Sequence, residues 1–153
     1  MPIVEMVIFM GAQAAGKTSY YKFRFFETHI RVNLDMLRTR NREKFLVEAC
    51  LQSKQPFVVD NTNVTVADRQ QYLRLASAHS FSVVGYYFQS IAAECVARNA
   101  KRNRDPLPVV PSVAIRGTIS RFEHPTFCEG FDQLYFVRIE NNSFMVEKWK
   151  DEI

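Results

Sequence analysis

The sequence lacks most features of a secreted or membrane protein. Its only three cysteines, Cys50, Cys95 and Cys128, are far apart and form no C-x-x-C pair, so neither a disulfide framework nor a zinc or redox motif is indicated. No apolar run approaches the roughly 20 residues of a membrane-spanning helix. The short apolar run from Val7 to Met10 has no basic segment before it, unlike a signal peptide. We therefore expect a soluble, intracellular protein with reduced thiols.

Low-complexity segments, internal repeats and linker-like stretches are also missing. The 153 residues are 47% hydrophobic and include 13 Phe, which is enough apolar material for one buried core, so we expect a single domain over residues 1–153. The net charge of +4 only mildly favours a polyanionic partner. The basic residues gather in two clusters, which fit either solvated helix faces or an anion-binding surface: Arg38, Arg40 and Arg42, and then Arg98, Lys101, Arg102 and Arg104.

The hydrophobic pattern predicts strands that alternate with helices along the chain. We expect strands over 3–10, 30–33, 57–60, 81–88 and 134–139, and helices over 17–26, 36–53, 66–78, 91–102 and 112–122. A loop with three prolines, Pro106, Pro108 and Pro111, separates the last two helices, because proline disrupts a helix interior. This alternation predicts an α/β fold with a parallel sheet, helices on both faces and right-handed crossovers.

The segment GAQAAGKT directly follows the first strand and fits the phosphate-loop pattern G-x-x-x-x-G-K-[ST] at every fixed position. A strand ends at Gly11 and a helix begins near Gly16, so backbone N–H groups and the positive helix end can surround phosphate oxygens. Lys17 would supply charge to the β- and γ-phosphates, and the Thr18 hydroxyl would ligate magnesium. The bland alternative is a chance match at a glycine turn. The predicted nucleotide-binding residues are Gly11, Ala12, Gln13, Ala14, Ala15, Gly16, Lys17, Thr18 and Ser19.

An aspartate ends the third strand, PFVVD. Phosphate-loop enzymes hold magnesium or its waters with an Asp in this position, so Asp60 is a candidate metal residue, unless it only caps the turn that follows. The next residue is Asn61, where enzymes that hydrolyse ATP for motion usually have a water-activating Glu. Transfer of the phosphoryl group to a bound acceptor is therefore favoured over hydrolysis. No N-K-x-D signature of guanine specificity occurs.

Acceptor chemistry has a candidate in VNLDMLR, which places Asp35 near the carboxyl edge of the sheet, where α/β folds bind ligands. Its carboxylate could take the proton of an attacking hydroxyl, or could simply cap a helix that starts at Met36. Arg38, on the same helix face, could hold an acceptor phosphate or lie in solvent. Arg98 and Arg102 are four residues apart, so they suit a lid that closes over the phosphate, although surface arginines show the same spacing.

These motifs together resemble the 5′-polynucleotide kinases, including the kinase half of the bifunctional 3′-phosphatase/5′-kinase repair enzymes. The likeness rests on GAQAAGKT, VNLDMLR, FVVDNTNVT, ARNAKR and the later segment VPSVAIRGTISRFEHPTFCEGFDQL, and it extends from Val7 to about Ile139. It implies a phosphate-loop NTPase sandwich of three layers, with a five-stranded parallel sheet and a basic lid. Leu34 departs from the family, whose members commonly have Arg just before the catalytic Asp.

The resemblance also implies roles for single residues. Asp35 would be the general base, Lys17 and Thr18 would serve ATP and Mg²⁺, and Arg98 and Arg102 would be the lid arginines. The residues expected to contact the acceptor are Arg38, Asn61 and Thr62. The implied activity is transfer of the ATP γ-phosphate to the 5′-hydroxyl end of DNA or RNA, in nucleic-acid repair.

Two other functions remain open from the sequence. A kinase for a small hydroxyl compound, such as a nucleoside, sugar or antibiotic, would share the ATP half of the site and differ in its acceptor pocket. A nucleotide-dependent switch or assembly ATPase would need a water-activating Glu and a partner surface, and the sequence offers neither. DNA and RNA cannot be distinguished, because single strands are bound through backbone charge and base stacking.

Overall fold

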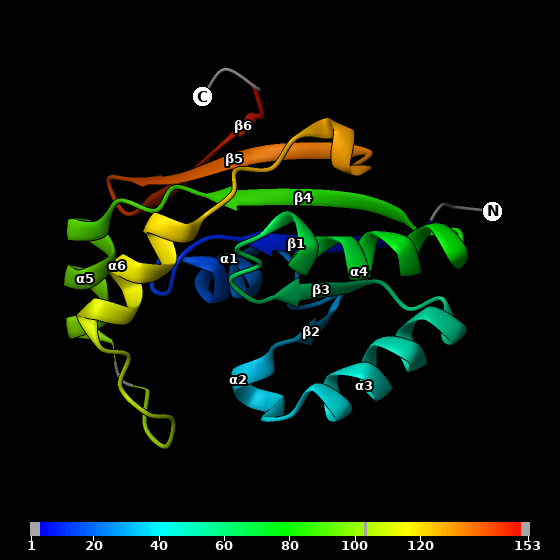
Figure 1. Cartoon of the computed structure of the whole chain (residues 1–153), viewed down its shortest axis with the longest axis horizontal. Coiled ribbons are helices and arrows are strands. Elements are labelled where there is room, and N and C mark those ends of the chain that lie inside the picture. The colour runs from blue at the N-terminus through cyan, green and yellow to red at the C-terminus, as the bar shows by residue number, and fades with distance from the viewer. Residues whose placement is uncertain (1–3, 103, 151–153) are drawn as a thin grey trace.

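The fold alternates strands and helices from β1 to α6 and ends in two paired strands (Figure 1). It was obtained as a computed structural model, and it describes residues 4–102 and 104–150; Ile3, at the start of the expected first strand, lies outside this range. The elements are β1 (Glu5–Met10), α1 (Lys17–Arg24), β2 (Ile30–Val32), α2 (Leu34–Leu37), α3 (Arg40–Ser53), β3 (Phe57–Asp60), α4 (Val66–Ala78), β4 (Ser82–Phe88), α5 (Ala92–Lys101), α6 (Ser112–Arg121), the 3₁₀ turn η1 (Phe127–Glu129), β5 (Gln133–Glu140) and β6 (Ser143–Lys148).

The sheet has the order β2-β3-β1-β4-β5-β6. The first five strands are parallel, as predicted, and β6 pairs antiparallel with β5. The expected count of five was therefore one strand short. Asn141 and Asn142 connect the last two strands with φ of 52° and 59°, a conformation that Asn tolerates in tight hairpin turns. The sequence pattern did not predict β6, because five of its six residues are exposed and its apolar residues do not alternate with polar ones.

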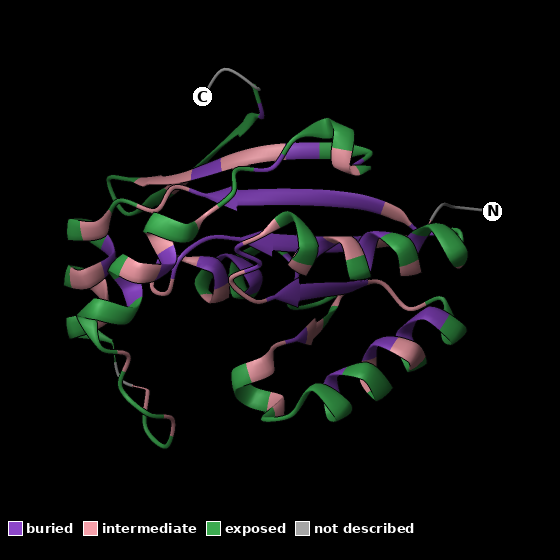
Figure 2. Cartoon of the chain, viewed as in Figure 1, coloured by how far each residue is buried: buried purple, intermediate pink, exposed green. Residues whose placement is uncertain are grey.

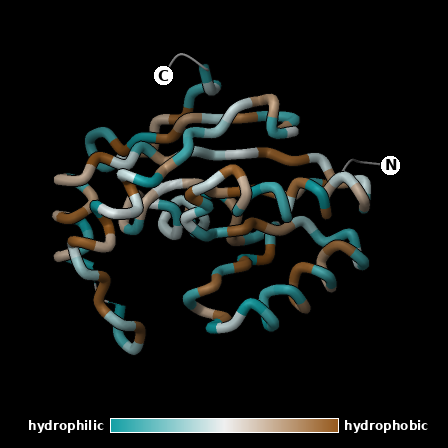
Figure 3. Tube along the Cα trace, in the orientation of Figure 1, coloured by the Kyte–Doolittle hydropathy of each residue, from teal (hydrophilic) through white to brown (hydrophobic). Residues whose placement is uncertain are grey.

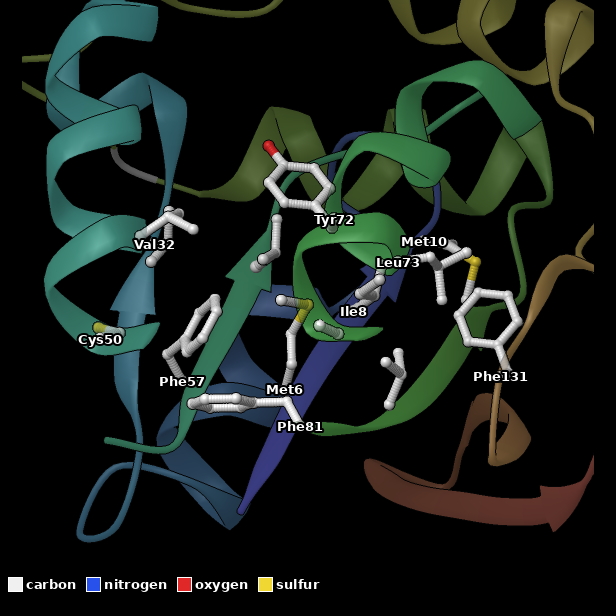
Figure 4. Close-up of a cluster of buried hydrophobic side chains, with 14 of the residues drawn as sticks. Met6, Ile8, Met10, Val32, Cys50, Phe57, Tyr72, Leu73, Phe81 and Phe131 are labelled. Carbon is white, nitrogen blue, oxygen red and sulfur yellow. The ribbon is translucent and has the colours of Figure 1, made fainter. Parts of the chain in front are cut away.

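Helices cover both faces of the sheet, which gives the predicted three layers (Figure 1). Alternate side chains of β1 pack on opposite faces of the sheet. Met6 and Ile8 belong to the core between the sheet and helices α3 and α4, whereas Val7 and Phe9 belong to the core between the sheet and helices α1, α5 and α6. Figure 4 shows the first of these cores and Figure 2 the burial along the strands. Figure 3 shows that hydrophilic and hydrophobic residues alternate along the helices.

The region predicted as one helix over 36–53 is broken into α2 and α3. Arg38 has φ 76°, and Thr39 caps the second helix by accepting a hydrogen bond from the Arg42 N–H at 3.1 Å. Side-chain capping by threonine competes with a continuous helix, and the apolar spacing alone did not reveal it. The short helix α2 directly follows β2 and therefore lies at the carboxyl end of that strand.

A buried ion pair ties α4 to the segment before β5. Arg69 is fully buried, and its guanidinium donates to both carboxylate oxygens of Glu129 at 2.8 and 3.0 Å. A third donation, of 2.9 Å, reaches the carbonyl oxygen of Asn63. The sequence E-H-P-T-F-C-E-G-F around Glu129, which contributes to the family resemblance, therefore has a structural task here.

Replacing Arg69 with methionine is expected to lower the free energy of unfolding by about 3 to 5 kcal/mol, because it leaves the Glu129 carboxylate buried without its partner. Urea unfolding followed by circular dichroism measures this loss. Arg74→Met, at an exposed position of the same helix, serves as the control and should change stability by less than about 0.5 kcal/mol. A comparably small loss for Arg69→Met would show that this pair does not hold the segment.

Within the described residues, none of the helices combines the length and the apolar character needed to cross a membrane.

Candidate functional site

The loop between β1 and α1 has the backbone of a phosphate-binding loop. Ala14 and Gly16 both have positive φ, at 62° and 102°, which turns successive N–H groups toward one point. A side chain at Gly16 would be strained by the φ of 102° and would also require the terminal methyl of Ile139, 2.8 Å from the added Cβ, to move. The first N–H groups of α1, which have no acceptor within the helix, face the same region.

Lys17 lies inside this loop and is 8% exposed. Its Nζ donates to the carbonyl oxygens of Gly11 and Ala12 at 2.9 and 2.6 Å. Burial lowers the pKa of Lys17 to about 8, and the negative charge of Asp60 acts in the opposite direction. A phosphate beside this ammonium group would add negative charge and so favour the protonated form.

Two contacts from distant segments fix the loop in place. The Gly11 N–H donates to the Thr62 carbonyl oxygen at 3.0 Å, and the Ala12 N–H donates to Ser90 Oγ at 2.9 Å. The Ser90 hydroxyl in turn donates to the Phe88 carbonyl oxygen at 2.8 Å. We did not predict a role for Ser90, because it follows β4 and has no motif around it.

Thr18 and Asp60 meet as the metal prediction requires. The Thr18 hydroxyl donates to Asp60 Oδ2 at 3.0 Å, and the Asp60 side chain is almost fully buried. The carboxylate also accepts a hydrogen bond from Arg31 Nε at 2.8 Å. Asp60 Oδ2 therefore contacts the side chains of Thr18 and Arg31, and not the turn that the sequence alternatively suggested as its partner. Asp60 Oδ1 is buried without a hydrogen-bond donor, so a hard cation or its water would satisfy it.

Asp35 is in the first turn of α2 and is not its cap. Asn33 caps this helix instead, because its Oδ1 accepts from the Met36 N–H at 3.0 Å, so the capping alternative for Asp35 was wrong. The Asp35 side chain is 64% exposed, and its Oδ2 accepts from Arg104 Nη2 at 2.8 Å. Arg104 comes from the loop between α5 and α6, so the pair joins the acceptor side to this loop.

The three predicted acceptor residues have different surroundings. Arg38 ends α2 with positive φ and faces the cavity described below. Asn61 accepts from the Leu34 N–H at 2.9 Å and donates to Glu43 at 3.1 Å, so its amide also holds α2 and α3 in position. The backbone of Thr62 anchors the phosphate loop, as above.

The two arginines predicted to form a lid lie at the end of α5. Arg98 donates to the Ala14 carbonyl oxygen at 3.3 Å and pairs with Glu94 at 3.4 Å. Arg102 ends the helix, and its Nε donates to Asn99 at 3.1 Å. Burial, followed by the repulsion of Arg104, lowers the pKa of Arg102.

One cavity of about 910 Å³ brings these groups together. It lies beyond the carboxyl ends of the strands, near α2 and the loop that follows α5 (Figure 1). Its lining has eight Lys or Arg side chains and three Asp side chains. Three residues of the predicted set do not line the cavity: Gly11, Ala12 and Ala15. The predicted residues that line it are Gln13, Ala14, Gly16, Lys17, Thr18, Ser19, Asp35, Arg38, Asp60, Asn61, Thr62, Arg98 and Arg102.

Arg31 and Arg104 also line the cavity, and the sequence did not suggest the contacts that they make. Arg31 contacts both Asp60 and Thr18, and Arg104 contacts Asp35. Arg104 belongs to a basic cluster that was recognised as such, whereas Arg31 stands alone in a three-residue strand, without a motif that marks it.

Comparison with protein families places this geometry in a known group. The family model AAA_33, described as an AAA domain, matches residues 6–125. A bifunctional polynucleotide phosphatase/kinase of Schizosaccharomyces pombe is 29% identical over 133 residues, which cover 83% of this chain and 32% of the relative. A putative bifunctional polynucleotide phosphatase/kinase of Acanthamoeba polyphaga mimivirus is 25% identical over 154 residues, covering 95% of this chain and 36% of the relative.

The chain thus spans about a third of the length of the curated relatives it matches. These two matches confirm the family resemblance inferred from the sequence motifs.

Solved structures share the fold at low sequence identity. Kti12 of Chaetomium thermophilum, in complex with ADP-AlF3, has a TM-score of 0.61 and 14% identity and covers 87% of this chain and 88% of its own. A gluconokinase from Sinorhizobium meliloti has a TM-score of 0.60 and 15% identity, and the match covers 90% of this chain and 84% of the gluconokinase. A chain of the Pnkp1/Rnl/Hen1 RNA repair complex has a TM-score of 0.64 and 19% identity, and the match covers 79% of this chain and 44% of that one. At these identities the likeness establishes a P-loop kinase fold.

Proposed function

This chain belongs to the AAA domain family that its residues 6–125 match, and we propose that it is an ATP-dependent polynucleotide 5′-hydroxyl kinase. The proposed reaction moves the γ-phosphoryl group of ATP onto the 5′-hydroxyl end of DNA or RNA. A role in nucleic-acid repair is part of the proposal, and it rests on the resemblance of the sequence motifs to those of repair kinases.

The observation that carries the proposal is the position of Asp35 in the same cavity as the phosphate loop. A carboxylate that faces the γ-phosphate region can accept the proton of an attacking hydroxyl. The excess of basic side chains in the lining suits both a triphosphate and the phosphates of a strand end. A phosphoryl donor and a polyanionic acceptor would thus meet at one place.

Mg²⁺ is the proposed cofactor of the nucleotide. Thr18 and Asp60 would hold it, and the buried, unpartnered Oδ1 of Asp60 together with an all-oxygen donor set fits this ion. When bound with ATP, Mg²⁺ would neutralise part of the phosphate charge. Lys17, Arg98 and Arg102 would act on the charge that develops on the transferred group.

A second cavity, of about 440 Å³, adjoins the acceptor side. Asp35, Arg38 and Arg104 form its polar wall, and its apolar wall is the loop 107–111. Such a combination fits a terminal nucleotide, because the base can lie on apolar side chains while arginines hold the phosphate that follows. A compact sugar acid would leave most of this apolar wall uncovered.

The decisive experiment measures transfer of radioactive phosphate from [γ-³²P]ATP. The acceptors are a 5′-hydroxyl oligonucleotide, a nucleoside, gluconate and buffer alone. We expect labelling of the oligonucleotide at a rate far above that of the other three. Preferred labelling of the nucleoside or gluconate would make the chain a small-molecule kinase, and equal release of phosphate in buffer would make it an ATPase.

The lid arginine Arg102 offers a test of the transfer step. Arg102→Ala is expected to lower kcat by about a hundredfold while the Kd for ATP stays within about threefold, because lid arginines act mainly on transition-state charge. Turnover assays and fluorescent-nucleotide titration measure the two quantities. Lys101→Ala, which removes the preceding positive charge outside the cavity lining, should leave both near the parent values. An Arg102→Ala effect confined to the KM for ATP would contradict this role.

A further inference from the structure

Arg31 occupies the part of the cavity that the proposed function gives to the metal. Its Nε donates to Asp60 Oδ2 at 2.8 Å, and its Nη2 donates to Thr18 Oγ1 at 3.1 Å. Thr18 Oγ1 lies 3.0 Å from the same carboxylate oxygen. One guanidinium group therefore contacts both side chains proposed to hold Mg²⁺.

The sheet brings this arginine to Asp60. β2 and β3 are parallel neighbours, and Arg31 pairs with Val58, two residues before Asp60. The Asp60 side chain is 1% exposed, whereas that of Arg31 is 23% exposed and lines the cavity. A buried carboxylate needs a countercharge, and the Lys17 ammonium donates hydrogen bonds to two backbone carbonyls of the phosphate loop. Arg31 is therefore the cation in direct contact with Asp60.

We propose that Arg31 is an internal cation that competes with Mg²⁺ for Asp60 and Thr18, and that it leaves them when the metal binds with nucleotide. Arginine keeps its charge at any relevant pH, so it cannot yield to a second cation by losing a proton. A metal ion on Thr18 Oγ1 would also lie within a few ångströms of the guanidinium, where like charges repel. The exposed side of Arg31 gives it a path into the cavity, toward the phosphates.

The consequence is a weak coupling between Mg²⁺ and nucleotide. In the parent protein, Arg31 already neutralises Asp60, so nucleotide binds well without metal, and Mg²⁺ tightens it only modestly. In Arg31→Gln the uncompensated carboxylate repels metal-free nucleotide and attracts the metal. The factor by which Mg²⁺ tightens ADP binding should therefore rise at least about tenfold.

The experiment is isothermal titration of ADP in Mg²⁺ and in EDTA. It compares the parent with Arg31→Gln, Asp60→Asn, the double variant, and Arg74→Gln as a matched control at an exposed position of α4. We expect the coupling factor to rise in Arg31→Gln, to stay at the parent value in Arg74→Gln, and to be the same in the double variant as in Asp60→Asn. An unchanged factor in Arg31→Gln overturns the proposal.

This inference rests on the proposed magnesium site, and the variants separate the two. If Asp60→Asn keeps the parent coupling, the metal does not use Asp60 and the site itself is wrong. If Asp60→Asn removes the coupling while Arg31→Gln leaves it unchanged, the site stands and the competition by Arg31 is refuted. The acceptor plays no part in these measurements, so a different acceptor would alter none of them.

A second measurement uses the parent protein and so does not depend on the stability of Arg31→Gln. The Nε–Hε resonance of Arg31, identified by its loss in Arg31→Lys, reports the contact with Asp60 in an NMR spectrum. Addition of ADP with Mg²⁺ should shift this resonance and speed its exchange with water, whereas ADP in EDTA should not. A resonance that stays the same in both conditions shows that Arg31 keeps its place, and overturns the proposal.

Discussion

Lys17→Ala is expected to lower phosphoryl transfer by at least about 10³-fold while the protein stays folded. The Lys17 ammonium lies in the phosphate loop and donates to the Gly11 and Ala12 carbonyl oxygens. A phosphate of ATP would offer it a far stronger acceptor than a carbonyl, because both partners would then be charged. Alanine removes this charge from the place where negative charge develops during transfer.

Turnover of a 5′-hydroxyl oligonucleotide and circular dichroism together measure this result. Lys44→Ala, which removes an equal charge at an exposed position of α3, should keep parental activity. Lys17→Ala with near-parental turnover would remove Lys17 from the mechanism. A variant that has lost cooperative unfolding would instead make Lys17 a structural residue.

The pH dependence of stability gives an independent test of the environment of Lys17. Burial lowers its pKa to about 8, from an ordinary value of 10.5. Between these two pH values the unfolded chain binds the proton and the folded chain does not, so this group makes the free energy of unfolding rise with pH. Urea unfolding from pH 7 to pH 10.5 should show a smaller rise for Lys17→Ala than for the parent or Lys44→Ala. Equal slopes would mean that Lys17 is not desolvated.

The fold was predictable to the extent that it rests on local patterns. Short sequence patterns of a few residues identify three features: the apolar run of β1, the glycines of the phosphate loop and the strand that ends at Asp60. The division of one expected helix at Arg38 and Thr39 was missed, because a single threonine cap outweighed the apolar spacing. The last strand, β6, lacked a clear pattern, since it lies at the edge of the sheet and buries little.

The site was predictable as a set of residues but not as a set of contacts. Motifs identified Lys17, Thr18, Asp35 and Asp60, and the structure brings all four to one cavity. Which cation faces which carboxylate depends on the strand order and on the path of the loop after α5. The contact between Arg104 and Asp35 joins segments 69 residues apart, and no local spacing encodes such a pair.

Asp35→Asn is the second change with a large expected effect, because it separates the acceptor chemistry from the ATP site. Asparagine keeps the size of the side chain and removes the basic oxygen that would take the proton of the 5′-hydroxyl. Asn33, and not Asp35, caps α2. The Asp35 carboxylate is mostly exposed, so loss of its pairing with Arg104 should cost the fold little.

Loss of a positioned base typically lowers a rate by roughly 10² to 10⁴. Asp35→Asn should therefore transfer phosphate to a 5′-hydroxyl oligonucleotide at least about a hundredfold more slowly, while its melting temperature and its Kd for ATP with Mg²⁺ remain near the parent values. Glu27→Gln, which removes the same charge at an exposed position outside the cavity, controls for the change in net charge. Because ATP binding and folding are measured on the same sample, they exclude the ATP site and the fold as causes of slow transfer by Asp35→Asn. Near-parental transfer by that variant would assign the proton to another acceptor and leave Asp35 as a partner of Arg104 alone.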